Sequence, residues 1–451
     1  MPGPAPPQRV VVVGGGQFGA TTVQALLEGP YKGRGDLITI VDRGAEPPAV
    51  DAAISDYNKI VRADYSDPIY QKLALEAIAA WRTPQWSDFF HECGVLVGSA
   101  TSDPQIGYVR AAHKLNVDSK DGKVSALERG RKIQGLYKKP VVSGEHEGDE
   151  AYINYVGGWA ATRAVIVHLI NQARHQGVKI VHGEGASLLT SSSPSSAKPV
   201  VKGIRLTDGR TLEADVTVIA AGSWTPKILP ELSTNCLSTG QTVCTILLDE
   251  EMQKKYKDMP VSFFVDTGFY CFPPTADGIL KLAIHDRGWL APSGNYPSLP
   301  RTTLSRGFEK QEIPASALAA LKVQMRRVHP ELAELLETRL YQTRLCWYSD
   351  RESGDFLYDW HPDYASNSLF VAAGGSGHAA KFIPSTGHWI VSAMQGTLDP
   401  QLARLWSFYG DKSRLDKSRG EGPIVRRDLD TGKVAVVKMA DAERVQIKAK
   451  L

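Results

Sequence analysis

Three glycines near the start of the chain have the spacing of a dinucleotide-binding turn. Residues 9–19, RVVVVGGGQFG, run from an apolar strand into Gly14-x-Gly16-x-x-Gly19, and a helix that packs on a sheet is predicted to follow. Such glycines permit a tight turn, a close backbone approach to a pyrophosphate, and close packing of helix on strand. A second apolar strand, LITIVD, ends at Asp42, 23 residues after Gly19, where a carboxylate can hold ribose hydroxyls. These residues suit FAD and NAD equally well.

A second feature with chemical potential is the stretch TRLCWYSD, residues 343–350, which places Cys346 beside aromatic and acidic residues. A lone cysteine is either a small buried hydrophobe or a thiol with a chemical role, and the pattern leaves both open. The cysteines form no CxxC pair and no even-numbered framework, which indicates reduced thiols in an intracellular chain and no metal site. The five are Cys93, Cys236, Cys244, Cys271 and Cys346.

The elements around these residues are predicted from periodicity and turn residues. A hairpin turns at Asp208-Gly209, and a buried strand from Val216 to Ala221 then ends at Gly222, where a small residue lets the backbone approach a cofactor. Residues 68–92 indicate a helix that breaks near Pro84 and resumes.

Later segments complete the outline. Residues 157–186 predict a helix, a glycine stop at Gly177 and a strand. Residues 236–345 predict a substrate-covering sheet with helices around 314–338, and residues 367–382 predict a strand, a glycine turn and a helix start.

Taken together, several motifs resemble the monomeric sarcosine oxidase and fructosyl amino acid oxidase family of flavoproteins, which includes saccharopine and pipecolate oxidases. They are GGGQFG, DYNKIVRADYSDPIY, AAGSWTP, GILKLAIH, RLCWYSDRESGDFLYDWHPD and AAGGSGHAAKF, and the likeness runs from about residue 8 to 410. The resemblance implies FAD instead of NAD. It also implies an α/β plus α+β fold, with a Rossmann-like FAD-binding domain of the glutathione-reductase type and an inserted substrate domain built on a mostly antiparallel sheet. We expect residues 1–92, 155–232 and 343–451 in the first domain and residues 93–154 and 233–342 in the second.

The resemblance implies a set of cofactor contacts. The family carries its flavin on a cysteine through an 8α-S-cysteinyl bond, and Cys346 aligns with that cysteine. The expected cofactor-binding residues are Gly14, Gly16, Gln17, Phe18, Gly19, Asp42, Arg43, Lys59, Gly222, Cys346, Gly375, Gly377, His378 and Lys381.

Four residues are expected to be catalytic by the same resemblance. Lys281 aligns with the lysine that activates oxygen below the flavin, and period-two alternation puts it on one strand face with Ala283 and His285. Lys59 corresponds to the cation that faces the isoalloxazine, and Tyr270 and His285 to residues bordering the amine. The alternatives are a solvated Lys281, a core Tyr270 and a hydrogen-bonded strand His285.

Two cations are expected to bind the substrate. Lys381 matches the lysine that holds the substrate carboxylate, and Arg62 matches a cation near the substrate; for Lys381 the alternative is a surface helix lysine. Relatives that act on Amadori products carry an arginine-rich stretch where this chain has ARLWSFYG, with Ser407 and Phe408 after Trp406. An Amadori substrate is therefore disfavoured.

The expected activity is oxidation of a secondary amine or N-substituted amino acid, with hydride transfer to FAD, an imine as product, and oxygen reduced to hydrogen peroxide. A protonated nitrogen would oppose iminium formation, so cations near the flavin favour the reactive, neutral amine. The alternatives are a tailoring enzyme whose imine closes a ring, or a fructosyl amino acid oxidase. From other classes, an NAD-dependent dehydrogenase or a non-catalytic flavoprotein remains open.

Composition narrows partners and location. A net charge of +3 without a dense basic run predicts no nucleic acid partner, and the absence of a window of about 18 uncharged apolar residues predicts no membrane span. The N-terminus lacks the features of a secretory signal. The last residues, Ala449, Lys450 and Leu451, are close to the Ser-Lys-Leu address, which predicts a peroxisomal import receptor as partner, or otherwise a cytoplasmic location. We expect a monomer.

Overall fold

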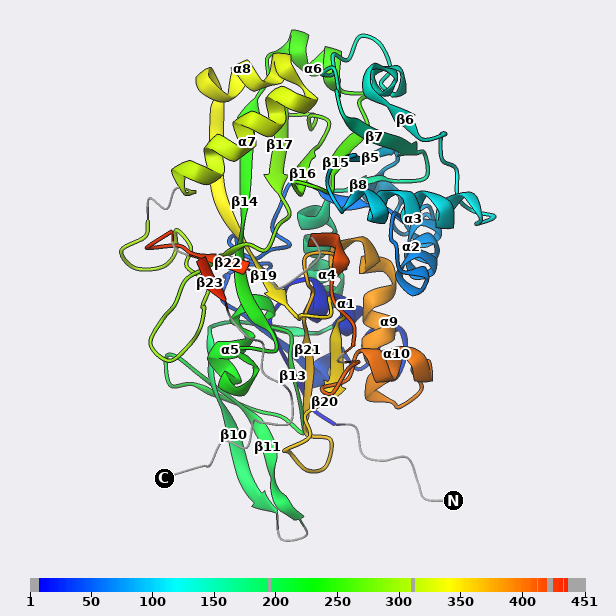
Figure 1. Cartoon of the computed structure of the whole chain (residues 1–451). Coiled ribbons are helices and arrows are strands. Elements are labelled where there is room, and N and C mark those ends of the chain that lie inside the picture. The colour runs from blue at the N-terminus through cyan, green and yellow to red at the C-terminus, as the bar shows by residue number, and fades with distance from the viewer. Residues whose placement is uncertain are drawn as a thin grey trace.

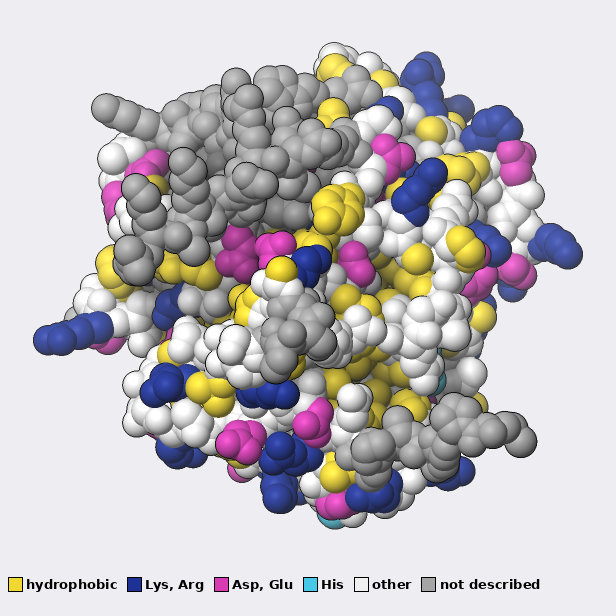
Figure 2. Space-filling model, turned by 90° about the horizontal axis from the view of Figure 1, so that it is seen from below, with side chains coloured by type: hydrophobic (Ala, Val, Ile, Leu, Met, Phe, Trp, Pro, Cys, Tyr) yellow, Lys and Arg dark blue, Asp and Glu magenta, His cyan; other side chains and the backbone are white. Residues whose placement is uncertain are grey.

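The computed structural model of this chain describes residues 8–193, 196–309, 313–411, 413–419, 425–432 and 434–436. Two large sheets lie one above the other in Figure 1, joined by helices and by the long strands β14 and β19. Within the described residues, none of the helices combines the length and the apolar character that crossing a membrane requires. On the face drawn in Figure 2, cationic and acidic side chains are interspersed and form no broad basic patch.

The first sheet has six strands in the order β20-β21-β13-β1-β2-β9 and is parallel except for the antiparallel pair β20 and β21. Its central strand β1 is VVVV and is buried along its whole length, as expected for a strand covered on both faces. The strands are β1 (Val10–Val13), β2 (Ile38–Asp42), β9 (Lys179–His182), β13 (Val216–Ile219), β20 (Leu357–Trp360) and β21 (Leu369–Ala373).

The second sheet has eleven strands and is mostly antiparallel; β15 with β5 and β18 with β22 are the parallel pairs. Its strands are β5 (Val95–Ala100), β6 (Glu128–Arg129), β7 (Asp149–Asn154), β14 (Leu237–Leu247), β15 (Val261–Phe264), β16 (Phe269–Cys271), β17 (Ile279–Ile284), β18 (Trp289–Leu290), β19 (Leu340–Asp350), β22 (Val425–Asp428) and β23 (Val434–Val436). One face packs on α7 (Ala315–Val328) and α8 (Pro330–Thr338) in a core that contains Leu280, Leu282 and Leu321.

Two three-stranded sheets complete the β structure: β10 (Gly185–Ser193), β11 (Ser196–Leu206) and β12 (Thr211–Glu213), and β3 (Lys59–Val61), β8 (Gly158–Ala160) and β4 (Phe90–His91). The other helices are α1 (Gln17–Glu28), α2 (Pro68–Trp81), α3 (Ile106–Val117), α4 (Thr162–His175), α5 (Thr225–Ile228), α6 (Glu250–Tyr256), α9 (Ile383–Met394) and α10 (Pro400–Leu405).

The predicted elements are confirmed with one exception. The hairpin at Asp208-Gly209 joins β11 to β12, and Gly177 separates α4 from β9 with a φ of 90°. The helix predicted over residues 68–92 is wrong in its second half: α2 ends at Trp81, and Phe90–His91 forms β4 instead. Pairing of β4 with β8 supplies backbone hydrogen bonds that a local helix pattern does not reveal.

The predicted domain limits can be compared with the two large sheets. All strands of the six-stranded sheet fall within residues 1–92, 155–232 and 343–451. The expected limit at residue 343 falls inside β19, which pairs along its length with β14 in the large sheet, and β22 extends the same sheet through β18. The large sheet therefore continues into the chain beyond residue 343.

The packing of α1 against α9 fixes the position of the turn that precedes α9. A Cβ built on Gly387 would lie 1.9 Å from the carbonyl oxygen of Thr21, so no side chain fits between the helices. The same contact holds α1, which begins at Gln17, against the segment that carries Lys381.

We therefore expect Gly387→Ala to lower the free energy of unfolding by about 1–3 kcal/mol, because overpacking forces the helices apart. A matched control is Gly107→Ala in α3, where nothing lies within 4 Å of the added methyl group. That change should raise stability by about 0.5–1 kcal/mol. Urea unfolding followed by circular dichroism measures both. Equal effects of the two substitutions would contradict this account of the α1–α9 contact.

Candidate active site

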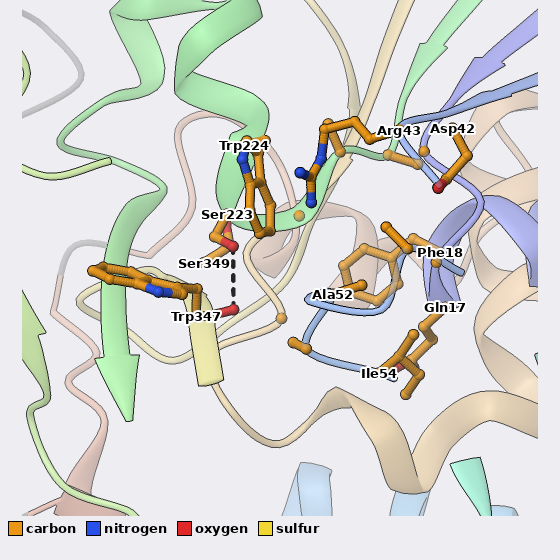
Figure 3. Close-up of a pocket in the computed structure, with 18 of the residues that line it drawn as sticks. Gln17, Phe18, Asp42, Arg43, Ala52, Ile54, Ser223, Trp224, Trp347 and Ser349 are labelled. Carbon is orange, nitrogen blue, oxygen red and sulfur yellow. Dashed lines mark hydrogen bonds between the residues drawn. The ribbon is translucent and has the colours of Figure 1, made fainter. Parts of the chain in front are cut away.

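A long cavity follows the carboxyl ends of β1, β2 and β13, where parallel strands of an open sheet bind ligands. Figure 3 shows it, with Gln17 and Phe18 from α1, Asp42 from β2, Arg43 directly after β2, and Trp224 after β13 around the same space. Ala52 and Ile54 line another side of this cavity.

The glycines of the first turn have the roles that their spacing predicts. Gly14 has a φ of 111°, and a Cβ there would lie 2.3 Å from the oxygen of Ala220 in the neighbouring turn. A Cβ on Gly19 would lie 1.8 Å from the oxygen of Gly14. Gly16 and Gly222 instead face open space, with nothing closer than 3.9 Å to a Cβ on Gly16 and nothing within 4 Å of one on Gly222. The turn is thus compact on the protein side and open on the cavity side.

Asp42 lies at the end of β2, and its carboxylate accepts hydrogen bonds from the backbone N–H groups of Gly15 and Gly44, both at 2.7 Å. Burial raises the pKa of the Asp42 carboxyl above its usual value, although these N–H groups oppose the shift. Next to it, the Arg43 guanidinium lies 3.8 Å from the centre of the Trp224 ring and pairs with Asp51 at 2.6 Å. Trp224 belongs to the AAGSWTP motif, but the sequence did not predict its position beside Arg43.

Gln17 and Phe18 connect this turn to the segment before α9. The Gln17 side chain donates to the oxygen of Ala379 at 2.8 Å, and the Phe18 ring contacts the Tyr358 ring edge-on, with 5.4 Å between the centroids. Gly375 and Gly377 line the same cavity. Gly377 has a φ of 71°, and a Cβ there would lie 2.3 Å from Tyr348 and 2.7 Å from His285.

The far end of the cavity meets the flat face of the large sheet. Cys346 is 1% exposed, and its sulfur accepts a hydrogen bond from the Lys59 amine at 3.5 Å. Lys59 lines the cavity itself. Strand register places Cys346 and Lys281 on the same face of the large sheet. Cys346 lies opposite Gln241 and Lys281 lies opposite Thr245, and both of these partners point to one face of β14.

One carboxylate organises this end, and the sequence analysis missed it. Asp56 lies 2.8 Å from the Lys59 amine and 2.9 Å from the Lys281 amine, and its third cation is Arg344 at 3.7 Å. Burial alone would raise the pKa of the Asp56 carboxyl, but the positive charges of these three side chains hold it far below its usual value. Asp56 stands in the DYNKIVR motif, two residues before Asn58. The sequence signal that could have identified it was an acidic side chain close to a lysine.

Lys281 is completely buried, so the alternative of a solvated lysine is wrong. Its amine also donates to the backbone oxygen of Asn58. Burial lowers the pKa of Lys281 to about 8, although Asp56 opposes the shift. For Lys59, by contrast, burial lowers the pKa, but the charge of Asp56 together with smaller contributions from Cys346 and Tyr348 raises it above its usual value. The predicted face is confirmed: Leu280 and Leu282 point into the helix-covered core, and Ala283 packs with Tyr270 and Cys346.

A second group of predicted residues lies beside Gly377. Lys381 is 4% exposed, so the surface-lysine alternative is wrong; its amine donates to the Tyr65 hydroxyl and to the backbone oxygen of His378, each at 2.8 Å. The Tyr65 hydroxyl also lies 2.9 Å from Nδ1 of His378, whose Nε2 lies 2.7 Å from the Gly354 oxygen. Burial, followed by the charge of Arg62, lowers the pKa of Lys381 well below its usual value.

Arg62 is 5% exposed and lines a separate cavity of about 620 Å³ together with Tyr65, Tyr108 and His378. Its guanidinium bonds to the Asp64 backbone oxygen and lies over the ring of Phe263, 4.8 Å from the centroid. Across the described chain, no carboxylate oxygen lies within 4 Å of the charged groups of Arg62 or Lys381. Within the described residues, Arg62 and Lys381 therefore form no ion pair, and the buried Asp64 carboxylate acts on their pKa values only from beyond 4 Å.

Tyr270 lies on β16 and His285 directly follows β17, two paired strands inside the large sheet, and they are 5% and 7% exposed. The His285 and Tyr348 ring centroids are 5.9 Å apart. Burial and the surrounding cations, Arg419 and Arg62 first among them, lower the pKa of His285 well below its usual value, so the imidazole is neutral. The glycine turn and Asp42 line one end of the cofactor cavity, and Lys59 and Gly377 line the other. Cys346 contacts Lys59, Lys281 shares the Asp56 carboxylate with Lys59, and His285 lies against Gly377.

These residues fit a bound FAD. The glycine turn and the start of α1 would hold the pyrophosphate, Asp42 the ribose, and Lys59, Cys346 and the turn at 375–378 the ring system.

Comparisons with known proteins agree with this geometry. Residues 9–393 match the model of the family described as FAD dependent oxidoreductase. The chain is 30% identical to the L-saccharopine oxidase of Schizosaccharomyces pombe, over 90% of this chain and 94% of that protein. It is 29% identical to the amino acid oxidase imqH of Aspergillus flavus, over 90% of this chain and 98% of that protein.

Among solved structures, Amadoriase I of Aspergillus fumigatus, as a double-cysteine mutant, superposes with a TM-score of 0.81 at 26% identity. The match covers 96% of this chain and 98% of that one. The fold predicted from the motifs, a Rossmann-like FAD-binding part with a mostly antiparallel substrate sheet, is confirmed. The chain belongs to the FAD-dependent oxidoreductase family.

Proposed function

We propose that this protein oxidises a secondary amine or an N-substituted amino acid at the carbon–nitrogen bond, giving an imine, and passes the electrons to oxygen to form hydrogen peroxide. The observation that carries the proposal is the pair Arg62 and Lys381. Both are buried beside the predicted flavin end, and neither forms an ion pair with a carboxylate of the described chain. A buried cation without an ion pair is costly, so an anionic substrate group is the expected partner.

The buried side chains of the site have different proposed roles. Arg62 and Lys381 hold the substrate carboxylate, and the 620 Å³ cavity leaves space for the remainder of the molecule. The cationic surroundings disfavour a protonated amine, because a second positive charge next to Arg62 and Lys381 is repelled. When bound, FAD supplies the acceptor for the hydride that leaves the carbon next to nitrogen. The neutral His285 and Tyr270 border this position and exclude water from it.

The oxygen reaction is proposed to use the Asp56 cluster. Lys281 and Lys59 both form ion pairs with the Asp56 carboxylate. Their positive charges therefore stay next to Cys346, and no anion from solvent is needed to hold them there. Fixed positive charge lowers the energy of the superoxide-like anion that forms as oxygen takes up the first electron.

The substrate class can be narrowed further. The activities for which the relatives are named favour saccharopine, other amino acids or fructosyl amines as substrate classes. Trp406 and Phe408 are buried core residues, and Ser407 accepts from Arg351 through its backbone, so the ARLWSFYG stretch supplies no cation to the 620 Å³ cavity. We therefore keep an Amadori substrate as second to a simpler N-substituted amino acid, with an imine that closes a ring as a further option.

The peroxisomal address, Ala449–Leu451, lies outside the described residues, and we retain peroxisomal location as a proposal because catalase there removes peroxide. A monomeric state is proposed as well.

The substrate proposal is tested by anaerobic mixing of the yellow holoenzyme with N-methyl amino acids, pipecolate, saccharopine and fructosyl amino acids. We expect flavin bleaching by at least one carboxylate-bearing amine. Arg62→Gln and Lys381→Met should each weaken binding of that substrate about 10- to 150-fold. This is the effect of losing one charge-assisted hydrogen bond of about 1.5–3 kcal/mol.

The matched control is the same amine without its carboxylate, whose bleaching should change little in either variant. A colourless purified protein would favour a nicotinamide-dependent dehydrogenase, and bound flavin that no amine bleaches would favour a non-catalytic flavoprotein. An equal loss with both forms of the amine would contradict carboxylate binding by these side chains.

Lys281→Met should slow reoxidation of reduced flavin by oxygen about 10²- to 10³-fold, the range for losing one electrostatic contact to the transition state. Anaerobic reduction should change far less. In the parent, reoxidation should weaken as pH rises through about 8, where Lys281 loses its proton, and the variant should lack this step. Lys322→Met, which removes a lysine paired with Glu337 away from the site, is the control. If both half-reactions slow equally, the role is wrong.

The covalent bond to Cys346 is tested by denaturing the protein in acid. We expect yellow colour in the precipitate for the parent and in the supernatant for Cys346→Ala. The Cys346 sulfur lies 3.5 Å from the amine of Lys59, which lines the cofactor cavity. Colour that leaves the parent protein completely on denaturation would rule out the thioether and leave Cys346 as a small buried hydrophobe. Cys244→Ala, a buried cysteine on the same sheet, is the control and should keep the colour in the precipitate.

A further inference from the structure

A third cavity reaches the Asp56 cluster from outside. It has a volume of about 570 Å³ and lies between α4 and the face of β14 and β19 that also carries Cys346. Figure 1 shows α4 beside the lower part of these two strands, above the six-stranded sheet. The cavity is lined by Val50, Ser55, Asp56, Tyr57, Ala161, Arg163, Ala164, Val167, Val243, Thr245, Gln342 and Arg344.

Strand register connects this cavity to the predicted flavin end. Side chains two apart on a strand share a face, so Gln342, Arg344 and Cys346 of β19 form one row. Across the ladder, Thr245 lies opposite both Gln342 and Lys281. Gln342 is exposed, Arg344 half-buried and Cys346 buried. The row therefore leads from solvent to the thiol over about 13 Å, at roughly 3.3 Å per residue.

At its inner end, a single layer of side chains separates this cavity from the cofactor cavity. Asp56 and Arg344 line the cavity, and Asp56 contacts the Lys59 amine at 2.8 Å, while Lys59 lines the cofactor cavity on the other side. Arg344 donates to the Ser55 backbone oxygen at 2.8 Å, but its Nη2 atom has no hydrogen-bond partner among the described residues. Nη2 lies 3.7 Å from Asp56, which is beyond normal hydrogen-bond length. Arg344 is thus the loosest of the three cations around this carboxylate.

We propose that this cavity is the entrance for dioxygen, with Arg344 at its inner end, and that it is separate from the cavity that takes the amine. The proposal rests on the proposed oxidase function. Five of the twelve lining residues are alanine or valine, and they give the cavity an apolar side that a small apolar gas can follow. The cationic inner end suits the anion that forms once the gas accepts an electron.

The reaction served by this route balances without another reagent. Dioxygen takes up the two electrons and one proton carried by the anionic reduced flavin, together with one proton from solvent. The O–O bond stays intact, two O–H bonds form, oxidised flavin is regenerated, and hydrogen peroxide leaves.

The two routes come from different parts of the chain. The 620 Å³ cavity with Arg62 is built by α2, α3 and residues 413–418, whereas the dioxygen cavity is built by α4, β14, β19 and residues 50–57. They have no lining residue in common. Oxygen can therefore reach the Asp56 cluster while an amine or its product still occupies the Arg62 cavity.

The kinetic test fills the cavity from the helix side. Ala164→Phe should lower the second-order rate constant for flavin reoxidation by at least about tenfold, with anaerobic reduction by the amine within about twofold of the parent. Ala164→Ser keeps the cavity open and should match the parent. Asn171→Phe adds the same ring two turns along α4, outside the cavity, and should also match.

A binding measurement keeps the proposal testable if Ala164→Phe folds poorly. Crystals of the parent holoenzyme under xenon should hold xenon between Ala164, Val167 and Val243, and the Ala164→Phe crystals should not. Xenon absent from this position in the parent, or parental reoxidation in a folded Ala164→Phe protein, would overturn the proposal. The proposed function has its own test: it is contradicted if no amine bleaches the flavin in the absence of oxygen.

Discussion

The Asp56 carboxylate is the interaction on which the predicted flavin end depends. Three cationic side chains, from β3, β17 and β19, reach it from three separated segments. Without a buried anion, the fully buried Lys281 would lose its proton or its position, because an isolated ammonium in a low-dielectric interior is unstable. One carboxylate thus fixes where the large sheet, β3 and the segment before it meet.

The Arg62 and Lys381 pair has the opposite character. These two side chains are buried with aromatic rings and neutral hydrogen-bond acceptors, and neither forms an ion pair with a carboxylate of the described chain. The Tyr65 hydroxyl connects Lys381 to His378, which holds the amine in place but does not neutralise it. The fold therefore keeps one cationic centre in ion pairs and leaves the other without one. That contrast supports the proposed division between a site that stabilises transient negative charge and a site that binds a stable anion.

Close backbone packing holds together the elements that carry the two centres. Gly377 fits against Tyr348 and His285 with no space for a side chain, and Gly387 lets α9 lie directly on α1. The six-stranded sheet positions the glycine turn, and the large sheet positions Cys346 and Lys281, so the predicted flavin end lies where the two sheets meet. Cavities then approach this place from different elements, which allows separate paths for different reactants.

The sequence alone determined the local features of this protein. A glycine turn after VVVV, an acid at the end of LITIVD, and period-two alternation around Lys281 depend on neighbouring residues, and local sterics and burial fix them. The motif order also identified the family. Only the tertiary structure decided that Phe90–His91 pairs as a strand, that β19 continues the large sheet past residue 343, and that Asp56 binds Lys59, Lys281 and Arg344. These contacts join residues as many as 288 positions apart, and no local pattern encodes which distant charge or strand edge will be left without a partner until the chain has folded.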